Sequence, residues 1–125
     1  MPQMASDEDI SRFIRSSFRS VWSLELLLLL KREAKPWPRE AIVAALRASD
    51  LIVAQGLDAL SAAGLVIVGE TGHAAYRPAS PSAAALVEGA ESLYARSPDA
   101  VRRLIVGAFA DPLTAFADAF RLRKE

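Results

Sequence analysis

The chain has 125 residues and no cysteine, and its 15 basic residues are matched by 15 acidic ones. The absence of cysteine excludes disulfide bonds, thiolate metal sites and cysteine nucleophiles. A formal net charge of zero disfavours a protein whose affinity comes mainly from phosphate contacts, because such domains are usually basic. This length suits one domain, or a small domain with an appended helical part, and buries enough surface for an ordinary core.

The sequence shows no segment typical of membrane association or export. Its first residues are acidic and polar, unlike a secretory signal peptide. The most apolar run, from Val21 to Leu30, is shorter than the 20 or so apolar residues that span a bilayer. We therefore expect a cytoplasmic protein that does not bind a membrane.

A first helix is predicted from Ser6 to Arg19, and residues 1–20 form an N-terminal helical segment. Ser6 and Asp9 have the spacing of a capping pattern, and the acidic first turn suits the positive end of the helix dipole. Three arginines recur along one face of this helix: Arg12, Arg15 and Arg19. They are either an ordinary solvated surface or a stripe that binds phosphate groups.

A second helix is predicted from Val21 to Glu33. Leucines surround its axis almost completely, which is typical of a helix buried at the centre of a fold. The sequence Lys35-Pro36-Trp37-Pro38 then breaks the helix, because proline cannot continue the backbone hydrogen bonds and pushes the residue before it into extended geometry. Trp37 is predicted to pair as a one-residue strand with a later hairpin.

Two further helices and a hairpin follow. Pro38 suits the first position of a third helix, which ends near Arg47-Ala48. Ser49 caps the next helix, and Gly64 stops it in a left-handed conformation. Val53, Leu57 and Leu60 recur at helical spacing and predict its buried stripe. Strands are predicted at 65–68 and 74–77, around a glycine-containing turn.

Residues 79–125 are predicted to form a C-terminal helical extension. Helices are expected from Ser82 to Arg96, from Ser97-Pro98 onward, and from Asp111-Pro112 onward, the last two opened by proline after a capping residue. Each of these helices is amphipathic, so each must bury one face against the rest of the chain or against a second copy of it.

The sequence lacks motifs typical of catalytic, metal-binding or nucleotide-binding sites. The only histidine, His73, falls in the predicted hairpin turn, where a catalytic Ser–His–Asp arrangement is improbable. Carboxylates are not clustered at the spacing of a zinc site, and the glycines match no nucleotide-binding motif. We therefore expect a protein that is not an enzyme and that uses no metal or cofactor.

The predicted fold is mainly α with a small β-hairpin. From about Trp22 to Pro78 the chain resembles bacterial winged-helix transcriptional regulators of the MarR-like and PadR-like kind. The resemblance rests on Trp37-Pro38, on Ser49, and on an L-x-x-L-x-x-x-G-L-V passage from Leu57 to Val66, and it covers under half of the chain. It implies a winged helix-turn-helix over residues 21–78, flanked by N- and C-terminal helices that form a homodimer.

The resemblance also implies that the Ser49 helix enters the major groove of duplex DNA. The predicted function is regulatory DNA binding that is modest or assisted by a partner. Its candidate residues comprise cations around the helix-turn-helix and two polar residues of the Ser49 helix: Lys35, Arg39, Arg47, Ser49, Gln55 and Arg77.

The outward face of the same helix favours a different role. No lysine or arginine occurs from Asp50 to Gly64, although base readout usually depends on such side chains. The alternative function is therefore a winged-helix protein-interaction module that does not bind DNA directly. Its candidate residues lie on the Ser49 helix and on the last predicted helix: Leu51, Ala54, Asp58, Ala62, Phe116 and Phe120.

Overall fold

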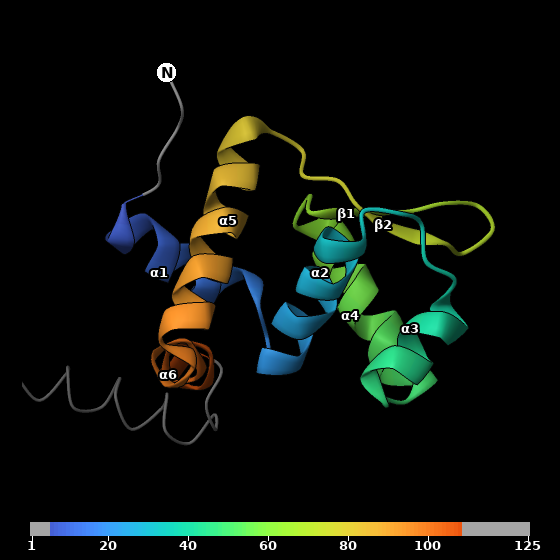
Figure 1. Cartoon of the computed structure of the whole chain (residues 1–125), viewed down its shortest axis with the longest axis horizontal. Coiled ribbons are helices and arrows are strands. Elements are labelled where there is room, and N and C mark those ends of the chain that lie inside the picture. Colours follow the sequence, from blue (N-terminus) through green and yellow to red (C-terminus); the bar gives the residue numbers. More distant parts are fainter. Residues whose placement is uncertain (1–5, 109–125) are drawn as a thin grey trace, which may run out of the picture.

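The computed structural model describes residues 6–108. This part of the chain is mainly helical and contains one small antiparallel sheet of two strands, which confirms the mainly α prediction (Figure 1). None of its helices has the length and apolar character needed to cross a membrane. The elements follow in the order α1 (Asp7–Ser17), α2 (Val21–Glu33), α3 (Arg39–Leu46), α4 (Asp50–Ala62), β1 (Val66–Val68), β2 (Ala74–Tyr76), α5 (Pro81–Arg96) and α6 (Pro98–Ala108).

Serine side chains fix where several helices begin. Each hydroxyl accepts the backbone N–H three residues further on at 3.0 to 3.1 Å, which satisfies a donor that the first helical turn leaves unpaired. These caps start α1, α2, α4 and α5, and the residues are Ser6, Ser20, Ser49 and Ser80. The predicted caps at Ser6 and Ser49 are therefore confirmed.

Several helix ends differ from the prediction by one or two residues. The first helix stops at Ser17, because Phe18 is extended and brings the chain to the cap at Ser20. Pro38 lies just before α3 as its N-cap, so it is not the first helical residue. Pro81 takes that position in α5, which begins one residue earlier than predicted. Gly64 has the expected left-handed backbone, with φ at 77°.

Helix α2 lies between two groups of elements. Figure 1 shows α1, α5 and α6 on one side of it, and α3, α4 and the hairpin on the other. Contacts of α2 reach β2 and α4 in one group and α6 in the other. As the all-round leucine pattern predicted, its fully buried side chains dominate the core: Leu24, Leu26, Leu27, Leu28 and Leu30.

Polar contacts also join α2 to α5. The Lys31 ammonium lies 2.8 Å from the Glu91 carboxylate. The Tyr94 hydroxyl donates a hydrogen bond of 2.5 Å to the Glu25 carboxylate. This hydrogen bond, together with partial burial, raises the pKa of Tyr94. The two contacts fix the orientation of α5 relative to the central helix.

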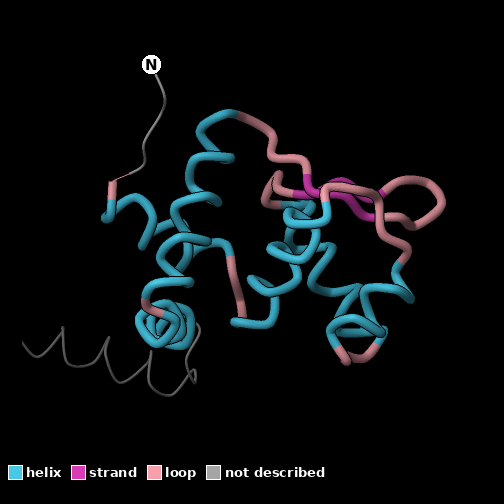
Figure 2. The backbone as a smooth tube through the Cα atoms, viewed as in Figure 1, coloured by secondary structure: helices cyan, strands magenta, loops and turns pink. Residues whose placement is uncertain are grey.

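The hairpin is anchored by the connection between α2 and α3, which runs beside it (Figure 2). Strands β1 and β2 pair in the register Val66↔Tyr76 and Val68↔Ala74. The backbone of Trp37 pairs with Ala74, with N–H···O distances of 2.7 and 2.8 Å. The predicted one-residue strand is therefore confirmed, and it ties the start of α3 to the sheet.

Helices α1, α5 and α6 contact one another on the far side of α2. A glycine makes the first of these contacts possible: a Cβ added at Gly89 of α5 would lie only 2.4 Å from Cδ1 of Ile10 on α1. Ile10 and Ile14 of α1 and Val101 and Ile105 of α6 are buried there. The N-terminal helix thus packs against α5 and α6, although the sequence predicts the N- and C-terminal parts as separate segments; the helix predicted from Asp111 onward lies outside the described residues.

Candidate functional site

Helix α4 presents one side to the core and the other to solvent. Its inward residues are buried as the helical spacing predicted: Val53, Leu57 and Leu60 are 4 % exposed or less. Its outward residues recur with the same helical spacing, and all four are exposed: Leu51, Gln55, Asp58 and Ala62. The exposed face therefore carries one carboxylate, one amide and no basic side chain.

The first turn of α4 exposes two neighbouring apolar side chains, which form an apolar cluster at the surface. The exposed fractions of Leu51 and Ile52 are 65 % and 47 %. A hollow of about 240 Å³ adjoins Ile52 and Gln55, and Trp22 of α2 and Gly56 of α4 line it. A Cβ at Gly56 would lie 2.9 Å from Leu26 Cδ2, so this glycine lets α4 approach α2 closely beneath the hollow.

Arg39, a cation close to the start of α4, forms an ion pair. The Arg39 guanidinium Nε at the start of α3 lies 2.9 Å from the Asp50 carboxylate at the start of α4. Both side chains are about half exposed or more, so the pair adds little stability. It nevertheless offsets the charge of Arg39, which weakens this residue as a phosphate contact.

A second hollow, of about 320 Å³, lies between α3, the middle of α4 and the hairpin turn. It brings together Arg39, Ala54 and Asp58, which the sequence assigns to different functions. His73 also lines it, and its ring nitrogen Nδ1 is 3.0 Å from the Thr71 hydroxyl. Because Glu40 lies there as well, this hollow is not a basic site for phosphate.

The remaining DNA-binding candidates are dispersed over different segments. Lys35 lies over the Trp37 ring, with its ammonium 5.3 Å from the ring centroid. Arg47 is exposed at the turn between α3 and α4, with a left-handed backbone, and Arg77 is exposed just after β2. The Ser49 hydroxyl accepts the Ile52 N–H, so it serves as a helix cap. Unlike these residues, Gln55 lies beside the Ile52 hollow.

Comparisons with known proteins add nothing to this geometry. Neither protein-family models nor curated proteins nor solved structures match the chain.

Some surface features were not predicted from the sequence. Ile52 was assigned to no face, and Ile67 and Val68 of β1 are 46 % and 42 % exposed. These two residues are consecutive in β1, and their exposure depends on what covers each face of the sheet, so the β-branched sequence cannot reveal it. Among the partner-binding candidates, Phe116 and Phe120 lie outside the described residues. Within residues 6–108 no group of three or more His, Asp or Glu side chains has the arrangement of a metal site.

Proposed function

We propose that residues 21–78 form a winged helix that serves as a protein-interaction module. The order α2, α3, α4, β1 and β2, with Trp37 paired to the hairpin, supports the winged-helix assignment. The function rests on one observation: the part of α4 that a DNA reader would place in the groove exposes apolar side chains in its first turn and carries no basic side chain.

The surface around Ile52 has the features of an anchor site. Protein interfaces depend on a few large side chains that fill pockets near the centre of the contact. Leu51 and Ile52 supply exposed apolar surface, and the adjoining hollow beside Trp22 accepts a side chain of the partner. The proposed partner therefore presents an apolar side chain to this hollow, whose lining also includes Arg19.

Duplex DNA remains the second candidate, because Arg47 and Arg77 are exposed and no ion pair engages either of them within residues 6–108. The balance of charge counts against this candidate: residues 21–78 contain six basic and six acidic side chains. A tight DNA binder makes about six to ten phosphate contacts, far more than these two arginines supply. The resemblance implies that a homodimer would place two such helices in successive major grooves.

The protein-binding proposal is tested with matched aspartate variants. A partner is first captured by the chain carrying a photo-crosslinker at Leu51, then purified, and its affinity for the parent is measured by calorimetry. Ile52→Asp places a charge in the apolar cluster, and we expect it to weaken binding at least about 30-fold, the scale of an interface hot spot. Ile67→Asp is the control, because the two isoleucines are 47 % and 46 % exposed.

Two results would contradict the proposal. In the first, Ile52→Asp binds the purified partner as tightly as Ile67→Asp. In the second, the parent binds labelled duplex DNA with a steep salt dependence, and Arg47→Glu with Arg77→Glu abolishes that binding. The second result would replace the proposal with the DNA-binding function.

A further inference from the structure

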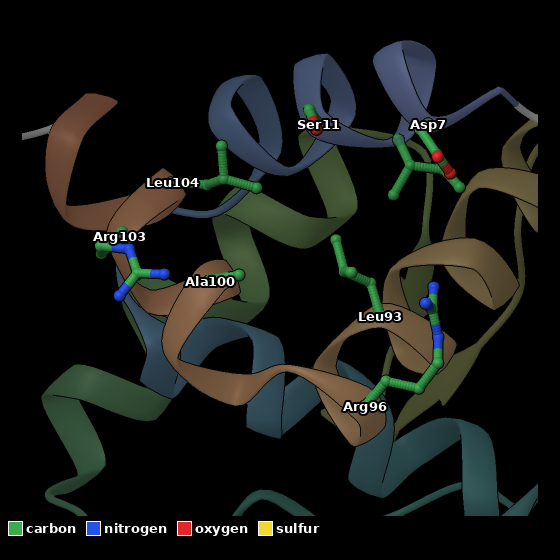
Figure 3. Close-up of a pocket in the computed structure, with 8 residues that line it drawn as sticks. Asp7, Ser11, Leu93, Arg96, Ala100, Arg103 and Leu104 are labelled. Carbon is green, nitrogen blue, oxygen red and sulfur yellow. The ribbon is translucent and has the colours of Figure 1, made fainter.

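A third hollow lies on the other side of α2, where α1, α5 and α6 meet (Figure 3). Its volume is about 450 Å³, within the range of small-molecule sites. Helices α1 and α5 touch at Ile10 and Gly89. The α5 residues that line the hollow, Leu93 and Arg96, follow Gly89 by about one and two helical turns. The close contact therefore bounds one end of the hollow.

The apolar residues that line this hollow are all aliphatic: Ile10 of α1, Leu93 of α5, and Ala100 and Leu104 of α6. Ser11 of α1 is the one uncharged polar residue of the lining. Ala100 contributes only a methyl group, which leaves room between the two leucines (Figure 3). The lining contains no aromatic ring on which a nucleobase stacks. The hollow therefore suits an aliphatic body.

Two arginines supply positive charge at the hollow. Arg103 and Arg96 come from different helices and lie toward opposite ends of it (Figure 3). Neither arginine forms an ion pair or a side-chain hydrogen bond within the described range. The neighbouring Arg102 differs, because it pairs with Asp99 at 3.0 Å. Since Asp7 is the one acidic residue of the lining, the hollow carries a net charge of about +1.

We propose that this hollow binds an alkyl carboxylate. Guanidinium groups bind carboxylates through paired hydrogen bonds, and the aliphatic wall covers the alkyl chain. The Asp7 carboxylate favours a ligand with one negative charge over a phosphate ester with two. The site is separate from the proposed partner surface on α4, so the two proposals stand or fall independently.

The proposal is tested by NMR titration of the whole chain with octanoate, following the methyl signals of Leu93 and Leu104. We expect saturable shifts with a Kd on the order of 1 mM, which suits a ligand of about ten non-hydrogen atoms. Octanamide lacks the charge and butyrate lacks most of the chain, so both should bind at least about fivefold more weakly. Octylammonium should not bind, because Arg96 and Arg103 repel it.

Variants locate the binding groups. Because the two arginines lie toward opposite ends of the hollow, the carboxylate pairs with one of them: either Arg96→Gln or Arg103→Gln should weaken octanoate binding about tenfold. Arg102→Gln should leave binding within about twofold of the parent. Ala100→Leu fills the hollow without changing its charge and should abolish binding. The proposal is overturned if the leucine methyl signals do not shift, if octylammonium binds as well as octanoate, or if neither Arg96→Gln nor Arg103→Gln weakens binding more than Arg102→Gln does.

Discussion

The two sides of α2 are both balanced in charge but have different surfaces. Residues 34–78 contain four basic and four acidic side chains, and the described residues outside 21–78 contain six of each. On the α4 side an acidic residue neutralises Arg39, and apolar side chains are exposed. On the α1, α5 and α6 side, Arg96 and Arg103 face a hollow with an aliphatic wall. Net charge therefore does not reveal what each surface can bind.

The largest expected effect is a loss of stability on substitution of a core leucine in α2, which tests whether the two sides of α2 unfold as one unit. Leu27→Ala empties a fully buried position in the helix between them and should cost about 3 kcal/mol of unfolding free energy. Leu51→Ala removes the same atoms from a residue that is 65 % exposed and should change that free energy by under about 0.5 kcal/mol. Urea unfolding followed by tryptophan fluorescence and by hydrogen exchange measures both. If exchange protection survives in α1 and α5 while α4 unfolds, the two sides are independent.

The close contact of α1 with α5 provides the next test. Gly89→Val forces the new side chain into Ile10 and should lower the unfolding free energy by about 2 kcal/mol. Gly107→Val is the control, because a Cβ there has no neighbour within 4 Å among the described residues. Both variants make the same Gly→Val change within a helix, so the difference between their melting temperatures measures the contact itself. Equal melting temperatures would show that α1 does not pack this closely.

The buried stripe of α4 and the Gly89 contact illustrate what the sequence can predict and what it cannot. Helical spacing identified Val53, Leu57 and Leu60 as core residues, because periodicity depends only on the helix itself. The Gly89 contact and the hollow near Arg96 depend on how three helices approach each other. Local sequence patterns carry no information on the distances and angles between helices.

The same limit applies to the candidate site. Charge and spacing placed Leu51 and Asp58 on the outer face of α4, where they are exposed. The Arg39–Asp50 ion pair joins two helices across a turn, and the hollow beside Ile52 depends on the approach of Trp22 from α2. Sequence reasoning therefore identified the outer face and missed the hollow beside it.

A smaller effect is expected at the junction of α2 with α5. Tyr94→Phe removes the hydrogen bond to Glu25 and should cost about 1 kcal/mol at neutral pH. Tyr76→Phe should cost less, because the Tyr76 hydroxyl has no hydrogen-bond partner among residues 6–108. The folded protein raises the pKa of Tyr94, so this stabilisation is present below the usual value of about 10 and is lost as the pH rises above it.

Chemical unfolding at pH values below and above 10 measures whether the stability falls as the pH rises. Tyr94→Phe should lose less stability than the parent at alkaline pH. Some loss remains, because burial and the nearby Glu88 and Glu91 also raise the pKa of Tyr76. Parallel pH profiles for the parent and Tyr94→Phe would contradict the hydrogen bond to Glu25.

The smallest expected effect concerns the ion pair between α3 and α4. A double-mutant cycle with Arg39→Gln and Asp50→Asn should give a coupling energy of about 0.5 kcal/mol, as is usual for exposed pairs. Added salt should reduce this coupling. A coupling near zero at low salt would leave Arg39 available for phosphate and strengthen the DNA-binding alternative.

The central claim is that the exposed start of α4 contacts protein. The most direct measurement places a photo-crosslinking amino acid at Leu51, with the same probe at Val106 on α6 as a control, in cells that make the protein naturally. Val106 is 62 % exposed, close to the 65 % of Leu51. We predict a discrete adduct at Leu51 only, sensitive to protease, resistant to nuclease and lost when Ile52→Asp is added. An adduct at Leu51 that nuclease removes, or none at all, would contradict the account.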